Sequence, residues 1–275
     1  MNRISPSRHS SIHVLSKFGL LDGEAAARVE FDWMVLGLKL TLLNRITPRV
    51  LRRKYVKALL PNNLNILLRN ATADISILYE IYLKKIYEKH CHLKPGDVVF
   101  DVGSHIGVFA LKASRLVGSS GVVYSFEPEP ENFMLLKRNV ASNNALNVKI
   151  FDRAVSSQSA MLHLHVHPTN TGMSSVQYAT GRTAQISVSS ITLDQVIKKY
   201  GIQHVDLLKL DVEGHELEVL RGANRFLSMC KHIVMETHEK EGGPPNAQII
   251  ETLKKYNFKI ELVYSELNDI LYGWK

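Results

Sequence analysis

Residues 98–107 of this 275-residue sequence, VVFDVGSHIG, combine residue types and spacings that suit ligand chemistry. Three apolar residues lead into Asp101, which is followed by Gly103 and Gly107. The pattern predicts a buried strand that passes through a glycine turn into a helix. Gly103 permits a tight turn, and Gly107 lets the helix begin close to the strand. An acidic residue before the first glycine suits a ligand with an ammonium group better than a bare pyrophosphate.

A second carboxylate follows the next predicted strand. Residues 121–127 read GVVYSFE, and Glu127 lies about 20 residues beyond Gly107. In a strand–helix–strand unit, a carboxylate at this position can accept hydrogen bonds from both hydroxyl groups of a ribose. The alternative is an exposed loop acid, and the glycine turn at the right distance favours the ribose role. Asp152, near the end of a third predicted strand, either accepts from an adenine amino group or caps the loop.

Charged residues also end two later strands. The run VDLLKLD ends in Asp211, with Glu213 close behind, and the run IVMETH carries Glu236 and His238 at its end. Lys209 shares a strand face with Asp211, and a buried lysine is costly unless it is paired. We therefore expect Lys209 to contact Asp211, Glu213 or Glu236.

The carboxyl ends of parallel strands meet at one edge of an open sheet, where such sheets bind ligands. The residues that converge there are Asp101, Gly103, Glu127, Asp152, Asp211, Glu213 and Glu236. This convergence favours an enzyme over a structural module. We also expect Asn170, Ser174, His215 and His238 to contact a substrate, because the loop around Asn170 and Ser174 is polar and contains glycine, as a lid would be.

Strands and helices alternate along the chain to position these residues. The predicted strands are residues 98–102, 121–127, 148–155, 161–167, 186–193, 205–211, 233–238, 259–263 and 269–274. The predicted helices are residues 74–92, which begin at Asp74 as N-cap, 108–116, 131–141, 194–200, a helix that ends at 227, and 247–256. This order predicts an α/β fold, a doubly wound and mostly parallel sheet with an antiparallel hairpin at its C-terminal edge.

Histidine and cysteine patterns do not predict a metal site. His163, His165 and His167 alternate with apolar residues, which is typical of the solvated face of an antiparallel strand. Binding of a metal by these histidines is the less favoured alternative. The two cysteines, Cys91 and Cys230, lie far apart and form no disulfide framework, which indicates a reducing, cytoplasmic compartment.

The positive charge of the chain is concentrated at its N-terminus. The net charge is +8, and residues 1–60 hold 11 Lys and Arg against 4 Asp and Glu, which leaves 23 against 22 for the rest. A nearly neutral main domain argues against a nucleic-acid-binding surface. We expect residues 1–70 to form a basic segment, a mobile tail plus helices, and residues 71–275 to form the catalytic domain.

Two interpretations of the N-terminal segment stay open. Residues 33–43 are apolar but too short to cross a bilayer, which takes about 20 residues. Residues 49–60 fit a helix with Arg49, Arg52, Arg53 and Lys57 on one face. Such a helix either packs on the main fold with its charges in water, which we favour, or makes a weak peripheral contact with an anionic membrane through residues 33–60.

Taken together, the motifs resemble the FkbM-type S-adenosylmethionine-dependent methyltransferases over about residues 74–260. The matching segments are DVGSHIG at 101–107, SFEPEPENF at 125–133, the pair Asn139 and Asn143, LKLDVEGHE at 208–216 with RGA after it, and METH at 235–238. LKLDVEGHE is the most specific of them. One departure is His105, where the family usually has Asn.

The resemblance implies a class I, Rossmann-like methyltransferase fold with S-adenosylmethionine as cofactor. It implies that Asp101, Gly103 and Gly107 surround the methionine end and that Glu127 holds the ribose. Ser104 and His105 fall in the same loop. Many members methylate hydroxyl groups of sugars or other natural products, so the expected partner is a small-molecule or glycan acceptor.

Methyl transfer needs the acceptor held against the methyl group and a site for the proton that leaves a hydroxyl. Three roles for the charged strand ends stay open. Asp211 acts as the base and is kept ionised by Lys209; Lys209, Asp211 and Glu213 form a structural ion network; or Asp211, Glu213 and Glu236 bind a hard cation. We favour the first and predict no metal.

Other functions are less well supported. A nicotinamide-dependent oxidoreductase would carry a third glycine shortly after the second, and this chain does not. N-methylation on the same fold, and a membrane-surface protein with an inactive methyltransferase fold, are the remaining alternatives. An inactive fold would have lost the charges at the strand ends, and here they are present.

Overall fold

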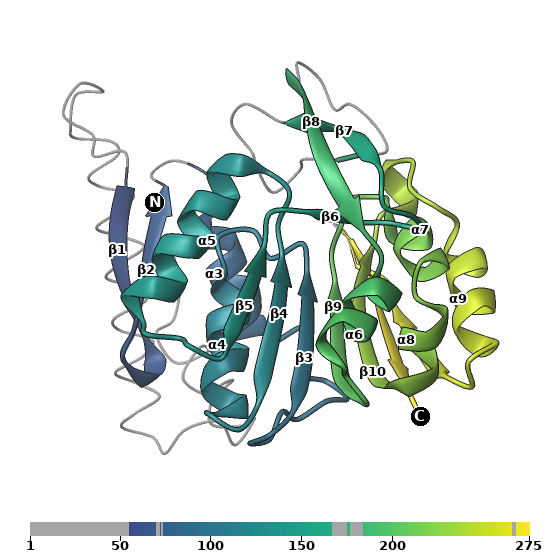
Figure 1. Cartoon of the computed structure of the whole chain (residues 1–275), viewed down its shortest axis with the longest axis horizontal. Coiled ribbons are helices and arrows are strands. Elements are labelled where there is room, and N and C mark those ends of the chain that lie inside the picture. The colour runs from purple at the N-terminus through teal and green to yellow at the C-terminus, as the bar shows by residue number, and fades with distance from the viewer. Residues whose placement is uncertain (1–54, 70–71, 73, 167–174, 177–183, 266–267) are drawn as a thin grey trace, which may run out of the picture. The chain divides into compact units, whose positions relative to one another are not determined.

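The computed structural model describes residues 55–69, 72, 74–166, 175–176, 184–265 and 268–275 (Figure 1). In this part of the chain, a seven-stranded sheet has the order β11–β12–β10–β9–β3–β4–β5. Its strands are β3 (Val98–Val102), β4 (Val122–Phe126), β5 (Val148–Phe151), β9 (Val205–Leu210), β10 (Cys230–Thr237), β11 (Lys259–Val263) and β12 (Asp269–Trp274).

The sheet has the predicted mixture of strand directions. β5, β4, β3, β9 and β10 pair in parallel, whereas β12 pairs antiparallel with both β10 and β11. The strand order reverses between β3 and β9. At such a reversal, the carboxyl ends of the two strands border a crevice in which open α/β sheets bind ligands. The predicted doubly wound, mostly parallel sheet with an antiparallel C-terminal hairpin is confirmed.

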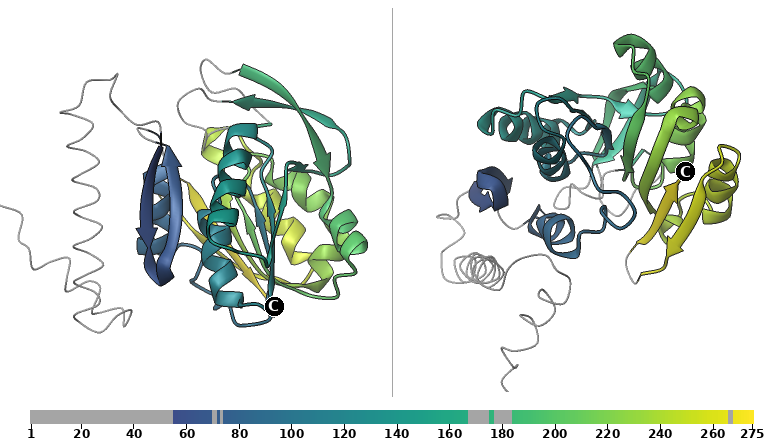
Figure 2. Two further views of the ribbon diagram at one scale, coloured as in Figure 1. Left: turned by 60° about the vertical axis from the view of Figure 1, so that its left-hand side comes forward. Right: turned by 90° about the horizontal axis from the view of Figure 1, so that it is seen from below.

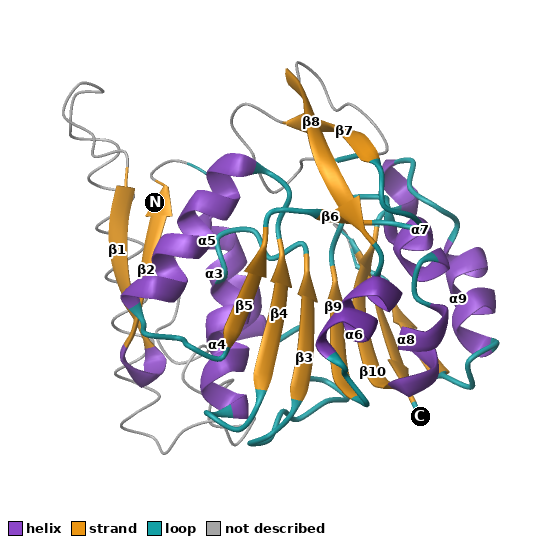
Figure 3. Cartoon of the chain, viewed as in Figure 1, coloured by secondary structure: helices purple, strands orange, loops and turns teal. Residues whose placement is uncertain are grey.

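Helices cover the sheet in two groups (Figures 2 and 3). α4 (Val108–Val117) and α5 (Pro130–Ser142) contact β3, β4 and β5. One hydrophobic core cluster joins the other face of the sheet to α6 (Leu193–Tyr200), α7 (Glu216–Arg221), α8 (Asn224–Met229) and α9 (Asn246–Lys254). Phe100 and Val102 belong to this cluster, and because side chains alternate along a strand, Asp101 points to the opposite face.

A small second sheet lies beyond the central one and has the order β6–β8–β7. Its strands are β6 (Ala154–Val155), β7 (Met161–Val166) and β8 (Ala184–Ile191). The prediction of one strand over residues 148–155 is therefore wrong, because the chain leaves the central sheet after β5 to pair with β8. On β7, Leu164 is buried and His163 is exposed, as the alternating pattern predicted; His167 lies outside the described residues.

The chain enters the described fold through a hairpin of β1 (Tyr55–Leu60) and β2 (Leu64–Arg69). The predicted helix over residues 49–60 is wrong for residues 55–60, where burial has period two: Ala58 and Leu60 are buried. The turn between the strands contains Asn62 and Asn63, both with positive φ, which asparagine tolerates. One compact unit spans Tyr55–Lys275, and residues 1–54 lie outside the described residues, so the division into residues 1–70 and 71–275 stays a prediction.

Asn139 of α5 and Asn143, the residue at the C-terminal cap of this helix, hold the hairpin. Asn139 accepts from the N–H of Leu67 at 2.7 Å and donates to the carbonyls of Leu67 and Ile106. Asn143 accepts from the N–H of Asn65 at 2.8 Å and donates to its carbonyl at 2.6 Å. Each side-chain amide therefore bonds both the N–H and the carbonyl of one residue of β2, as a residue of a neighbouring strand would. Asn139 also joins the hairpin to the glycine loop, because it bonds the carbonyl of Ile106.

One predicted helix ends earlier than expected, and another is divided into two. The predicted helix over 74–92 consists of α3 (Asp74–Tyr79) and a π-helical turn, η3 (Glu80–Lys84), and it ends where Lys85 has a positive φ. The predicted helix up to residue 227 is interrupted between α7 and α8, where Gly222 approaches the carbonyl of Ser156 too closely for a Cβ. Within the described residues, no helix combines the length and the apolar character needed to cross a membrane.

We predict that Asn139→Ala destabilises the protein by about 1–3 kcal/mol, because it leaves buried backbone groups of Leu67 and Ile106 without partners. Chemical denaturation followed by circular dichroism measures this loss. Arg138→Ala, on the exposed side of the same helix, is the matched control and leaves stability nearly unchanged. Equal stability of the two variants would contradict the anchoring role of Asn139.

Candidate active site

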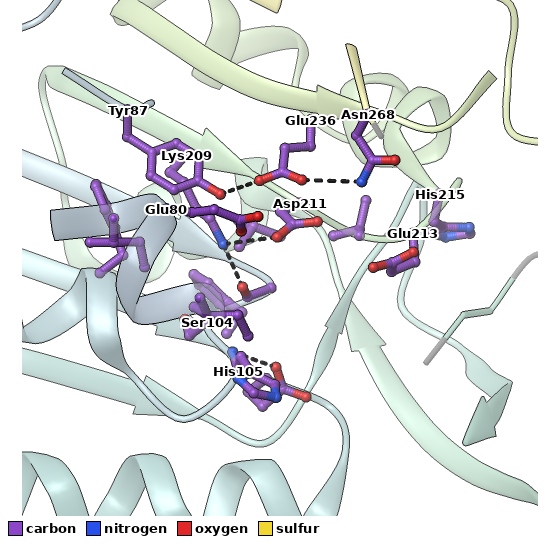
Figure 4. Close-up of a pocket in the computed structure, with 18 of the residues that line it drawn as sticks. Glu80, Tyr87, Ser104, His105, Lys209, Asp211, Glu213, His215, Glu236 and Asn268 are labelled. Carbon is purple, nitrogen blue, oxygen red and sulfur yellow. Dashed lines mark hydrogen bonds and ion pairs between the residues drawn. The ribbon is translucent and has the colours of Figure 1, made fainter. Parts of the chain in front are cut away.

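A cavity of about 430 Å³ opens at the carboxyl ends of β3, β4, β9 and β10 (Figure 4). This volume is within the range of small-molecule sites, about 300–1,000 Å³. The predicted site residues that line it are Gly103, Ser104, His105, Glu127, Lys209, Asp211, Glu213, His215 and Glu236. Strands distant in sequence thus bring most of the predicted residues to one cavity.

The other predicted residues lie elsewhere. Asp101 and Gly107 lie behind the cavity wall, in the buried part of the glycine loop. Asp152 is exposed and does not line the cavity, although the neighbouring Arg153 does, so its adenine-binding role stays a prediction. Asn170 and Ser174 lie outside the described residues.

The glycine loop has the tight geometry expected from the sequence. Gly103 has φ +79°, and a Cβ there would lie 1.7 Å from the carbonyl oxygen of Asp211. Gly107 has φ +88°, and a Cβ there would lie 2.6 Å from a methyl group of Leu136. The N–H groups of Gly103 and Ser104 both donate to the carbonyl of Phe126 at 3.0 Å. The loop therefore connects β3, β4 and β9 through contacts that only glycine allows.

Lys209 is the buried cation beneath this loop. Its Nζ lies 3.3 Å from Oδ1 of Asp101 and 3.7 Å from Oδ2 of Asp211, and it donates to the carbonyl of Gly103 at 2.6 Å. Burial lowers the pKa of Lys209, but the carboxylates of Asp101, Asp211 and Glu236 outweigh this effect and raise it. Lys209 therefore stays charged. The predicted contact with Asp211 is confirmed, and the contact with Asp101 was not predicted.

Glu127 is placed for hydrogen bonding at the cavity wall. It is 5% exposed and accepts from the N–H of His105 at 2.7 Å, the N–H of Glu129 at 3.0 Å and the side chain of Asn132 at 3.3 Å. Burial raises its pKa to about 7, although these hydrogen bonds oppose the shift. Its carboxyl group therefore changes charge near neutral pH.

His105 connects Glu127 to the N-terminal hairpin. It has φ +52°, and its Nε2 lies 2.9 Å from Nη2 of Arg69, at the end of β2. Arg69 is held in turn by Asp74, with Nη2 2.9 Å from Oδ1 and Nε 3.2 Å from Oδ2. Burial lowers the pKa of His105 to about 3, so the imidazole is neutral. Sequence reasoning missed Arg69 and assigned Asp74 only as an N-cap.

The opposite wall of the cavity is rich in carboxylates. Glu236 accepts from the O–H of Tyr87 and from the side chain of Asn268 at 3.3 Å (Figure 4). Burial raises the pKa of Glu236, and Asp211 raises it further. Glu80, from the π-helical turn, also lines this wall. Tyr87 and Asn268 were missed, because residues 85–92 were predicted as helix and Asn268 falls in the predicted hairpin turn.

His238 lies behind this wall and is 1% exposed. Its Nδ1 is 2.6 Å from Oε1 of Glu216, and its Nε2 is 3.5 Å from Oε2 of Glu213 and 3.9 Å from Oδ1 of Asp211. Burial lowers the pKa of His238, but the surrounding carboxylates raise it above its usual value. Burial also raises the pKa of Glu213.

His215 has a different environment from His238, although both were predicted to bind substrate. Its Nε2 lies 2.9 Å from Oγ of Ser156, and the residue forms part of the cavity wall. Burial lowers the pKa of His215, so its imidazole is neutral at physiological pH. The roles of both histidines toward a substrate stay predictions.

The cavity thus has two chemically different halves. Near Glu127 and the glycine loop, one carboxylate and apolar residues such as Phe126 and Val155 form the wall. Near Asp211, Glu213 and Glu236, carboxylates predominate. The first half suits a nucleoside, and the second suits a group that loses a proton or carries positive charge.

Comparisons with known proteins agree with this architecture. A family model described as the methyltransferase FkbM domain matches residues 101–260. The 31-O-demethyl-FK506 methyltransferase FkbM of Streptomyces tacrolimicus is 28% identical over 232 residues, which cover 73% of this chain and 88% of the relative. The hexuronic acid methyltransferase AglP of Haloferax volcanii is 30% identical over 143 residues, which cover 52% of this chain and 56% of the relative.

Among solved structures, the fold is similar to that of methyltransferase FkbM from Methylobacillus flagellatus KT. The TM-score is 0.50 at 15% sequence identity, and the match covers 72% of this chain. The chain spans about half the length of that structure, 48%. This similarity supports the class I methyltransferase fold.

We predict that Lys209→Met destabilises the protein by about 3–5 kcal/mol, because it leaves Asp101 as an unpaired buried charge. Adding Asp101→Asn removes that charge, so the double variant should be more stable than the single one. Thermal and denaturant unfolding measure both. Lys255→Met, whose ion pair with Glu251 is exposed, is the control with little effect. Additive losses in the double variant would contradict the pairing of Lys209 with Asp101.

Proposed function

This chain belongs to the FkbM family of methyltransferases, and on that premise we propose that its cavity transfers a methyl group from S-adenosylmethionine to a hydroxyl oxygen of a sugar or another natural product. The observation that carries the proposal is the convergence of Gly103, Glu127 and Asp211 on one cavity. The names of two relatives support the acceptor class, because one is named for 31-O-demethyl-FK506 and the other for a hexuronic acid.

The residues on the Glu127 side of the cavity fit S-adenosylmethionine. Glu127 presents a carboxylate to the cavity and would accept hydrogen bonds from the ribose hydroxyls. Phe126 and Val155 offer apolar surface for a base. Gly103, Ser104 and His105 would lie along the methionine end, close to the buried charge of Asp101.

The half of the cavity near Asp211, Glu213 and Glu236 supplies the group that accepts the proton. When bound, S-adenosylmethionine supplies the methyl group, whose bond to sulfur breaks as its bond to the acceptor oxygen forms. We propose that Asp211 takes the hydroxyl proton, because it lies at the end of β9 beside the glycine loop, with its Oδ2 3.7 Å from Nζ of Lys209. Glu236, held by Tyr87 and Asn268, orients the acceptor from the neighbouring strand.

We predict that the affinity for S-adenosylhomocysteine falls as the pH drops below about 7. The ribose hydroxyls bind the ionised Glu127 more tightly, so a proton on this group competes with the ligand; one pH unit below the pKa, affinity should be about tenfold lower. Isothermal titration calorimetry at pH 6 and pH 8 measures the change.

Glu127→Gln should weaken binding at pH 8 by about 1–3 kcal/mol and flatten this pH dependence. Glu131→Gln, exposed on α5, is the matched control and should keep the wild-type profile. An unchanged affinity in Glu127→Gln would remove Glu127 from the cofactor site.

We predict that Asp211→Asn lowers turnover about 100-fold or more, because the proton acceptor is lost. Fold and affinity for S-adenosylhomocysteine should be retained, as measured by thermal unfolding and calorimetry. Transfer of labelled methyl groups to glycan and natural-product acceptors gives the rate. Turnover within a few-fold of wild type would show that Asp211 is not the base.

A further inference from the structure

Asp211, Glu213 and His238 form a cluster of ligand atoms of the kind that holds a metal ion. Among the described residues, these three each offer one such atom, and the atoms all lie within 4.8 Å of one another. They come from two parallel strands: Asp211 and Glu213 follow β9, and His238 follows β10. We propose that this cluster binds one divalent cation and that the cation coordinates the oxygens of the acceptor.

The imidazole of His238 is oriented as a metal ligand. Glu216 lies 2.6 Å from Nδ1, so Nδ1 donates to this carboxylate, and Nε2 faces Glu213 and Asp211 and lies 3.4 Å from Nδ2 of Asn268; a bound cation would replace the proton on Nε2. A carboxylate that fixes the far nitrogen of a ligating histidine is a recurrent feature of metal sites. Glu216 is itself fully buried and also accepts from the N–H of Gly214 at 2.9 Å, so it is held in place independently.

The distances leave room for a cation. A metal bound at about 2.0–2.2 Å holds neighbouring ligand atoms roughly 3–3.5 Å apart. The separation of Nε2 of His238 from Glu213, 3.5 Å, lies at the upper end of this range. Its separation from Asp211, 3.9 Å, is larger, and the three ligand atoms lie within 4.8 Å of one another, so the side chains would have to move closer together to complete the site. Glu213 and Asp211 also line the cavity, so the remaining coordination positions would face the acceptor.

The local charge favours a cation over an anion. Asp211, Glu213, Glu216 and Glu236 lie around this wall, and the ammonium of Lys209 is shared between Asp211 and Asp101. Glu236 is directed toward Tyr87 and Asn268 and does not belong to the ligand cluster. The third ligand of the cation site is therefore His238, whereas the sequence suggested Glu236.

The donor set identifies the class of metal. Two carboxylates with one imidazole suit Mn²⁺, Fe²⁺ or Zn²⁺ better than Ca²⁺, which prefers oxygen ligands alone. A cation of this kind lowers the pKa of a bound hydroxyl. Oδ1 of Asp211 would bind the metal, while Oδ2, on the side of Lys209, would accept the proton. This role in catalysis rests on the proposed function, whereas binding of the cation does not.

Titration of Mn²⁺ into the EDTA-treated full-length protein, followed by the electron paramagnetic resonance signal of free Mn²⁺, tests the site. We expect one Mn²⁺ per chain, with affinity lost in His238→Ala and reduced at least tenfold in Glu213→Gln. Glu216→Gln should weaken binding by about 10- to 100-fold through the orientation of His238. His204→Ala is the matched control, because the side chain of His204 is exposed and does not belong to the ligand cluster.

The outcomes separate this inference from the proposed function. If circular dichroism shows that His238→Ala does not fold, the Mn²⁺ affinity of Glu213→Gln alone tests the cation site. Absence of stoichiometric binding of Mn²⁺, Mg²⁺ and Zn²⁺, or wild-type affinity in Glu213→Gln, would overturn the cation site. Calorimetry with S-adenosylhomocysteine on the same metal-free samples tests the cofactor site independently: its failure beside normal Mn²⁺ binding would overturn the proposed function and leave the cation site standing.

Discussion

A single buried ammonium group connects the parts of this site. Lys209 bonds the carbonyl of Gly103 and pairs with Asp101 and Asp211, so it fixes the glycine loop of β3 against the end of β9. A charge in this position would be strongly unfavourable by itself, and so would Asp101. The ion pair between Lys209 and Asp101 offsets the cost of burying both charges. Together the two residues set the distance between the two halves of the cavity. Gly103 is required by the same constraint, because the loop and β9 approach too closely for any side chain.

The carboxyl groups in the two halves of the cavity have different electrostatic environments. On one side, Glu127 is buried among backbone N–H donors, and its carboxyl group titrates near neutrality. On the other, Asp211, Glu213 and Glu236 lie close together. Burial and neighbouring carboxylates raise the pKa of Glu213 and of Glu236, while Lys209 and His238 supply positive charge beside Asp211. This half therefore suits a group that loses a proton or carries positive charge.

Most of the sheet and of the cavity could be predicted, because both depend on local patterns. Buried strands are read from apolar runs, and residues at their carboxyl ends must converge, so Glu127, Lys209 and Asp211 were placed correctly. Residues 55–60 were misread, because Lys57 and its neighbouring basic residues also fit a helix. They form a strand by pairing with β2, which Asn139 and Asn143 hold in turn. Tyr87 and Arg69 reach the site only through tertiary contacts that no spacing in the sequence encodes.

The contact between Arg69 and His105 joins the N-terminal hairpin to the carboxylate of Glu127 through one imidazole. Such a connection works in both directions. A partner that displaces β2 from α5 would also disturb the backbone N–H that Glu127 accepts, and so would weaken any ligand held by that carboxylate. Thermodynamic linkage then requires the ligand to oppose the displacement by the same factor. Displacement of the hairpin would therefore change the occupancy of a ligand held by Glu127.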